Sequence, residues 1–161
     1  MRKDIHMMLG LAAALILALM GCYSFRGGQL DFSTVAVPVA ENNTGEYRLP
    51  DMMTAAMISA VTNDGRAKIS DSGRAEAVLE ITITGYTRAA YQYTSQEQVN
   101  QYRATISAKA RLRSSGGRII WQSESISGWH VHPASEAEEE GMKKAAENLA
   151  AEIIRQCFEA W

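Results

Sequence analysis

A long alternation of apolar and polar residues between positions 101 and 113 constrains the fold more than any other feature of the chain. Successive side chains of a strand point to opposite faces, so this pattern predicts a β-strand with one buried and one exposed face. The next four residues, Ser-Ser-Gly-Gly at 114–117, predict a tight hairpin because paired glycines accept the positive φ angles that such turns require. The residues on the expected buried face are Tyr102, Ala104, Ile106, Ala108, Ala110 and Leu112.

Two further strands are predicted on either side of this one in the sequence. Residues 77–84 alternate in the same way, and residues 118–130 form the returning strand of the hairpin, with Trp121 and Trp129 expected on one of its faces. Residues 89–101 between the first two strands are polar and aromatic, and we expect them to form a long hairpin loop.

Two helices are predicted from apolar residues at helical spacing. The first ends at Gly65, which suits a left-handed cap, and its apolar face consists of Leu49, Met52, Met53, Ala56, Met57, Ala60 and Val61. The second follows Pro133, and Ser135 and Glu138 fit a capping box at its start. Its apolar stripe consists of Met142, Ala146, Leu149, Ile153 and Cys157.

A short strand precedes the first helix, because Val35, Val37 and Val39 alternate with other residues and Pro38 marks its end. The expected order is therefore strand, helix, three strands, helix. We predict an α+β fold, a two-layer sandwich in which both helices pack on one face of a four-stranded, mainly antiparallel sheet.

The N-terminal residues indicate an export signal. Residues 1–3 are basic on balance, residues 7–20 carry no charge, and this apolar run is shorter than the roughly 20 residues of a membrane-spanning helix. It ends in Leu-Met-Gly-Cys, which resembles the bacterial lipobox, where lipid is attached to the cysteine and the chain is cut before it. A plain cleaved signal and an uncleaved anchor are the alternatives. Tyr23 stands where an aspartate would favour the inner membrane, so the resemblance implies the outer membrane.

These observations predict three parts: a lipoprotein signal peptide at 1–21, a lipidated tether at 22–32, and a single domain at 33–161. We expect no cofactor besides the covalent lipid on Cys22, which comprises a diacylglycerol and an N-acyl chain such as palmitate. Cys157 would then be the remaining cysteine, and burial is favoured over a disulfide between chains.

The composition argues against nucleic-acid binding and catalysis. The 16 basic and 18 acidic residues of the full chain become 14 and 17 without residues 1–21, so the domain is not basic. The sequence contains no phosphate-binding glycine loop, no GxSxG and no CxxC. His130 and His132 could supply two metal ligands, but no third ligand has a recognisable spacing, so we predict no metal site and no enzyme.

One cluster of residues is a candidate binding site. Arg103, Lys109, Arg111 and Arg113 share the polar face of one predicted strand, and Arg118 lies just across the turn. Residues two apart on a strand are about 6.5–7 Å apart on the same face, so the last three on the strand form a close row. This row is either a solvated face that discourages edge pairing or a site for phosphate or carboxylate groups.

Several segments in fixed order carry a family resemblance. They read GCYSF at the lipobox, VAVPVAENNTGEY, RAEAVLEITITGYTRAAYQY, VNQYRATISAKARLR and IIWQSESISGW. Together they span residues 21–129, which resemble the LptE family of lipopolysaccharide-assembly lipoproteins, in particular its divergent branch.

The resemblance implies an α+β fold and a non-enzymatic role. Such proteins plug and assist the assembly of an LptD-type β-barrel in the outer membrane, and they bind lipopolysaccharide during its transport to the outer leaflet. Clustered phosphates or acidic sugars of lipopolysaccharide would then be the natural ligand of the basic strand. The alternative is a lipoprotein that activates or adapts a cell-wall synthase or another secretion complex.

Replacing the lipidation residue tests the N-terminal assignment. Cys22→Ala should leave a protein that is uncleaved or soluble, because the thiol that receives the lipid is gone. Mass spectrometry of the mature wild-type protein should find its first residue at Cys22 with added lipid. An unmodified terminus at another position would contradict the assignment.

Overall fold

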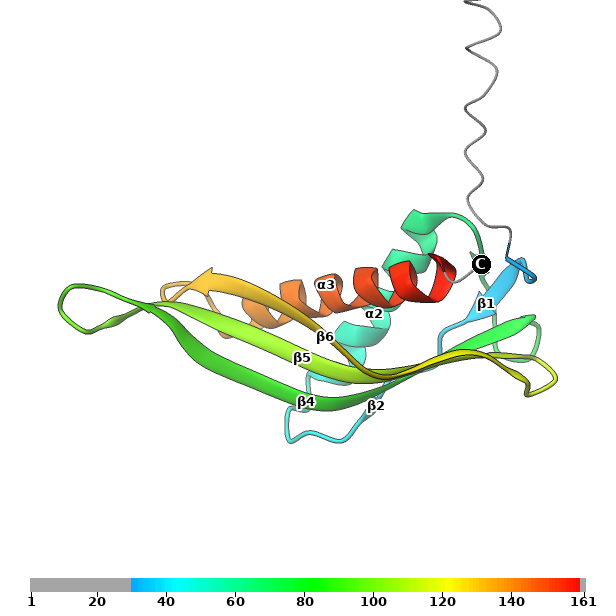
Figure 1. Ribbon diagram of the computed structural model, residues 1–161, viewed down its shortest axis with the longest axis horizontal. Helices are drawn as coiled ribbons and strands as arrows, with labels where there is room; N and C mark the ends of the chain where they lie inside the picture. The colour runs from blue at the N-terminus through cyan, green and yellow to red at the C-terminus, as the bar shows by residue number, and fades with distance from the viewer. Residues whose placement is uncertain (1–29, 160–161) are drawn as a thin grey trace, which may run out of the picture.

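The computed structural model describes residues 30–159, and Cys22 and the signal-like segment lie outside this range. Two helices cover one face of a mainly antiparallel sheet, which confirms the predicted α+β sandwich (Figure 1). The elements in chain order are β1 (Thr34–Ala36), β2 (Glu41–Asn42), α2 (Leu49–Asp64), β3 (Lys68–Ile69), β4 (Ala77–Tyr93), β5 (Val99–Ser114), β6 (Ile119–Pro133) and α3 (Glu138–Glu159).

The sheet is larger than expected at its N-terminal side. Its strand order is β3-β1-β4-β5-β6, with β2 also pairing with β4, so residues 30–159 contribute six strands rather than four. The added strands β2 and β3 have two residues each, too few to leave an alternation in the sequence. The first strand is shorter than predicted, because pairing stops at Ala36 and leaves Val39 67% exposed.

β4 continues far beyond its predicted end, and β5 begins two residues before its predicted start. The expected loop at 89–101 is wrong: only residues 94–98 connect the strands, and Thr94 N donates to Gln98 O at 2.7 Å. From Thr87 onward the added residues of β4 are exposed, so no buried face imposed an alternation that could be recognised. The tip of this hairpin projects beyond both helices (Figure 1). We call residues 88–103, which include the tip and the strand ends that lead to it, the arm.

A β-bulge in β6 reverses which side its residues face. Ala108 pairs with Ile126, but Ala110 pairs with Ser123, so β6 carries one extra residue between these points. As a result Trp121 pairs with the buried Leu112 on the helix-covered side. Trp129 instead lies on the open side of the sheet and is 54% exposed. The expectation that the two tryptophans share a face is therefore wrong.

The helices pack on the sheet through the predicted faces. In α2 the buried residues are Leu49, Met53, Ala56, Met57 and Val61, and Gly65 ends the helix with a φ of 75° while its N–H donates to Val61 O. The predicted stripe of α3 is fully buried as well. Neither helix is long and apolar enough to cross a membrane within residues 30–159.

The start of α3 differs from the predicted capping box. The helix begins at Glu138, so Ser135 lies in the preceding turn rather than at the N-cap. The Glu138 carboxylate does not reach back to that turn in a capping contact. It accepts a hydrogen bond of 2.8 Å from the Tyr86 hydroxyl of β4, which ties the helix start to the sheet.

Two glycines allow α3 to lie very close to β6. A Cβ atom on Gly128 would overlap the backbone of Leu149 in α3. A Cβ atom on Gly141 would overlap the imidazole of His132, which is fully buried. Glycine is required at both positions because α3 and β6 approach so closely, and neither glycine has a positive φ angle.

We expect Gly128→Ala to destabilise the fold, because the rigid backbone of α3 must move to admit the methyl group. Overpacking costs about 1–3 kcal/mol, and the upper end applies where the neighbour is backbone. The melting temperature should therefore fall by roughly 10 °C. Gly73→Ala is the control, since a Cβ there meets nothing within 4 Å. Equal melting temperatures for the two variants would contradict the close contact.

Candidate functional site

The basic residues of β5 lie on the open face of the sheet. Their neighbours in sequence, among them Ala104, Ala108 and Leu112, are buried under the helices, so Lys109 and Arg111 must point the other way. Both of these cations are exposed. The strand therefore presents the polar face that its alternation predicts.

Carboxylates interrupt this row of cations. Lys109 Nζ lies 2.8 Å from Glu124 Oε2 of β6, and Arg113 Nη2 lies 2.6 Å from Glu80 Oε1 of β4. The hydrogen bond from Lys109, followed by its charge, holds the pKa of the Glu124 carboxyl below its usual value. Arg111 takes part in none of the ion pairs formed within residues 30–159.

A shallow hollow of about 420 Å³ surrounds this part of the row. Lys109 and Arg111 contribute its positive charges, and the carboxylates of Glu41, Glu80 and Glu124 also line it. The hollow is therefore of mixed charge, which suits a ligand with both donors and acceptors better than a simple polyanion. Arg118 lies beyond it in the exposed turn before β6.

Arg103 lies apart from the others, on the arm. Its guanidinium carbon is 4.7 Å from the centre of the Tyr91 ring and 5.0 Å from the centre of the Trp129 ring. Its Nε atom is buried without a hydrogen-bond partner among the described residues. The two rings are about half exposed. We call Tyr91, Arg103 and Trp129 the arm cluster.

The aromatic part of this cluster was missed in the sequence. Tyr91 fell within a segment expected to be loop, and the bulge in β6 brings Trp129 to the open face. A cation between two rings is stabilised by their negative faces and keeps its hydrogen-bonding edge available. The arm cluster can therefore contact a flat or sugar-like surface while Arg103 binds an anionic group.

His130 and His132 lie in different surroundings. His132 is fully buried beside Tyr102, with Nδ1 3.2 Å from Pro133 O, whereas His130 is half-buried. Within residues 30–159 no group of three or more His, Cys, Asp or Glu side chains is placed to hold a metal ion. His132 packs against Gly141 of α3 and so has a structural position in the core.

Comparison with known proteins decides the family. The sequence profile of the LptE family, described as lipopolysaccharide-assembly, matches residues 32–157, which is most of the chain. The chain belongs to the LptE family. This family is non-enzymatic, in agreement with the absence of catalytic motifs from the sequence. No curated protein sequence matches the chain.

Solved structures share the fold of this LptE-family chain. The PelC dodecamer from Paraburkholderia phytofirmans is 16% identical with a TM-score of 0.55, over 80% of this chain and 91% of that one. The hypothetical protein CT253 from Chlamydia trachomatis is 11% identical with a TM-score of 0.58, over 78% and 96%. A minor lipoprotein from Acinetobacter baumannii is 12% identical with a TM-score of 0.52, over 81% and 94%. At these identities the likeness concerns the fold alone.

The lone thiol of the domain is placed for packing rather than chemistry. Cys157 is fully buried on α3, and burial raises the pKa of its thiol to about 12, while the charge of Arg66 acts in the opposite direction. Since the thiolate is the reactive form, such a thiol is inert at neutral pH.

We expect a water-soluble maleimide to label native Cys157 at least about a hundredfold more slowly than an exposed thiol. Ser115→Cys, in the exposed turn before β6, supplies that exposed thiol in the same protein. Both cysteines should react at similar rates in denaturant. Rapid labelling of native Cys157, or a disulfide-linked dimer as the main native form, would contradict its burial.

Proposed function

We propose that this LptE-family chain is an outer-membrane lipoprotein that is anchored through lipid on Cys22. In this proposal it plugs an LptD-type β-barrel and helps to assemble it. It also binds lipopolysaccharide during its transport to the outer leaflet. The observation that carries the proposal is the family match over residues 32–157. The domain suits the role, because one face of its sheet is closed by helices and the other is open to a partner.

Lipopolysaccharide offers phosphates beside sugar rings, and the open face carries groups that match both. On the arm, Arg103 can bind a phosphate while Tyr91 and Trp129 contact an adjacent sugar. Nearer the helix-covered part of the sheet, Arg111 is exposed and lies outside the described ion pairs. Lys109 and Arg113 already hold carboxylates, and Arg118 extends the positive charge at the turn.

Removing the two arginines tests lipopolysaccharide binding. A hydrogen bond to a charged group contributes about 1.5–3 kcal/mol, so Arg103→Gln with Arg111→Glu should weaken binding roughly tenfold or more. Binding by the wild type should also weaken as salt rises, because exposed charges are screened over about 8–10 Å. Lipopolysaccharide binding and thermal melting are measured on the same preparations, in low and high salt.

Lys144→Ala is the matched control, because it removes an exposed cation from α3, on the helix side of the sheet. It should bind lipopolysaccharide as the wild type does. If the variant with Arg103→Gln and Arg111→Glu is folded and binds lipopolysaccharide with the affinity of the wild type, these arginines of the open face do not bind lipopolysaccharide.

Affinity purification from solubilised outer membrane tests the other half of the proposal, and a large β-barrel should purify with the wild type in stoichiometric amount. If the arginine variant loses the barrel but keeps lipopolysaccharide, the open face is a protein contact. Recovery of a cell-wall synthase or another secretion complex would favour the alternative of an activator or adaptor.

A further inference from the structure

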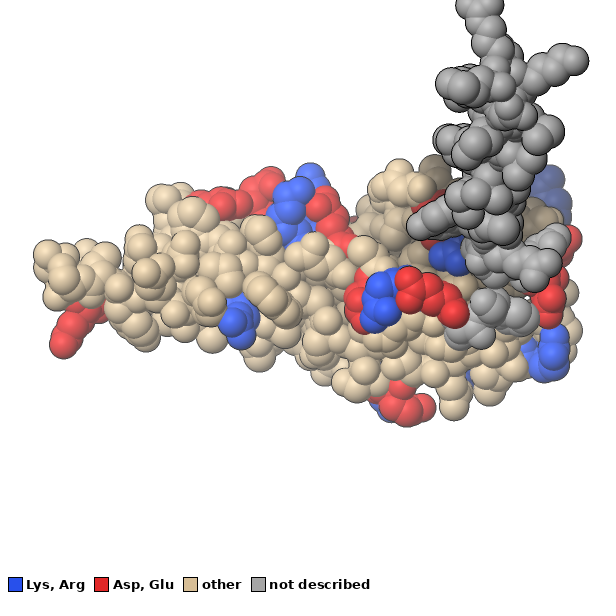
Figure 2. Space-filling model, turned by 45° about the horizontal axis from the view of Figure 1, so that its top comes forward, with Lys and Arg blue, Asp and Glu red and all other residues tan. Residues whose placement is uncertain are grey.

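A groove of about 980 Å³ lies between α2 and α3. Its apolar lining comes mainly from small residues on facing turns, together with two larger ones: Met52, Ala55, Ala56, Ala60, Ala151 and Ile154. Alanines leave the space between the helices unfilled where longer side chains would close it. Charged residues of both signs line its margin, and Figure 2, with the upper side of Figure 1 turned toward the viewer, shows acidic and basic side chains next to one another on this side of the molecule.

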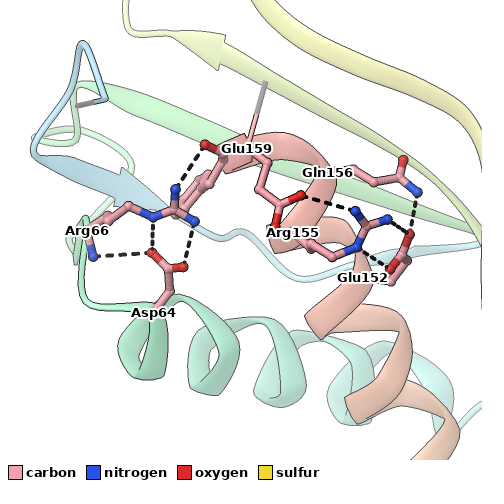
Figure 3. A network of polar contacts seen from close by, with 7 residues as sticks. Asp64, Arg66, Glu152, Arg155, Gln156 and Glu159 are labelled. Atoms are coloured by element: carbon pink, nitrogen blue, oxygen red, sulfur yellow. Dashed lines mark hydrogen bonds and ion pairs between the residues drawn. The ribbon is translucent and has the colours of Figure 1, made fainter. Parts of the chain in front are cut away.

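Ion pairs line one end of the groove, near the C-termini of the two helices (Figure 3). Arg66, just after α2, lies 2.8 Å from Asp64 and donates at 3.0 Å to the carbonyl oxygen of Phe158 in α3. The same guanidinium lies 5.2 Å above the Phe158 ring. On α3, Arg155 pairs with Glu159 at 3.1 Å. Of these contacts, those of Arg66 with Phe158 join the two helix ends.

The N-terminal segment enters the domain at this same end. The Phe32 ring packs edge-to-face against Phe158, with 6.0 Å between ring centres, and Leu30 is partly buried against the core. Phe158 thus contacts Phe32 on one side and Arg66, which lines the groove, on another. Leu30, the first described residue, therefore lies near one end of the groove.

The length and chemistry of the preceding segment fit the groove. Residues 22–29 reach about 26–29 Å when extended, and the 16 residues of α2 are about 24 Å long. Tyr23 and Phe25 are two apart, so both rings fall on one side of an extended chain. Arg26 is the charged residue of this segment, and its sign is opposite to that of the groove margin, which has four carboxylates and three cations.

We propose that the groove between α2 and α3 binds the chain's own tether, with the rings of Tyr23 and Phe25 on its apolar floor. Docking holds the membrane end of the tether along the helix side of the domain. The open face of the sheet, with the arm cluster, is then kept on the side away from the attachment point.

A photo-cross-linking residue at position 25 of the full-length protein, in its own membrane, tests the proposal. Benzoylphenylalanine in place of Phe25 should cross-link within the chain to the tryptic peptides 49–66 or 145–155, which carry the groove. Benzoylphenylalanine in place of Tyr93, in the exposed end of the arm, is the matched control and should not label these peptides.

Filling the groove should abolish the cross-link. Ala55 and Ala151 line it and are exposed, so Ala55→Arg with Ala151→Arg blocks it without disturbing the core. Phe25→Ser should lower the melting temperature of the wild type, since docking stabilises the folded state, but not that of the blocked variant. Because the effect of Phe25→Ser is compared between the two backgrounds, the test stays valid even if the arginines alter stability by themselves.

Three outcomes would overturn the proposal. They are cross-links from position 25 only to lipid or to another protein, cross-links to the groove of a second copy in a mixture of isotope-labelled and unlabelled protein, and an equal effect of Phe25→Ser in both backgrounds. None of these outcomes depends on whether lipopolysaccharide binds the open face, so the two proposals fail separately.

Discussion

Helix α3 packs on β6 with backbone against backbone, and the spacing between α3 and the sheet depends on this contact. Gly128 and Gly141 allow it, and the inward residues of β5 are also small where the helix passes, as at Ala104 and Ala108. Small residues on both surfaces bring helix and sheet close and leave little volume that could rearrange. The core is therefore tight at α3, whereas the alanines between α2 and α3 leave a groove.

Bulges in the two strands on either side of β5 change which side chains reach the open face of the sheet. β4 is irregular between Ile83 and Gly85, and β6 carries an extra residue between Ser123 and Ile126. Each bulge reverses the inward and outward sides beyond it and increases the local twist. Gly128 and His132 of β6 lie beyond its bulge and still pack against α3. The arm follows at the far end of the sheet (Figure 1), and Trp129 comes to the open face beside Arg103. The basic residues of the open face therefore lie on the regular strand β5, whereas the rings of Tyr91 and Trp129 come from the bulged strands β4 and β6.

The sequence predicted those parts of the fold in which burial imposes a period. The alternation of β5, the helical faces of α2 and α3 and the turn at Gly117 all belong to this class. It could not predict the arm, whose exposed residues follow no period, or the bulge, which changes pairing without changing composition. The capping box at Ser135 failed for a different reason, because a distant residue, Tyr86, takes the carboxylate of Glu138. Likewise the charge of Lys109 and Arg113 was visible in the sequence, but their ion pairs depend on strand register.

The place of β1 in the sheet has a mechanical consequence. Although it stands near the start of the described chain, it lies between β3 and β4 and is paired with both. Ser33, just before it, donates from N at 2.6 Å to Glu76, and its carbonyl accepts from Lys68. A pull on the N-terminus therefore loads hydrogen bonds on two sides at once, in shear along the strand, instead of peeling an edge strand one bond at a time. If the domain is held by its N-terminus while a partner moves, the three residues of β1 carry the force and resist unfolding of the domain.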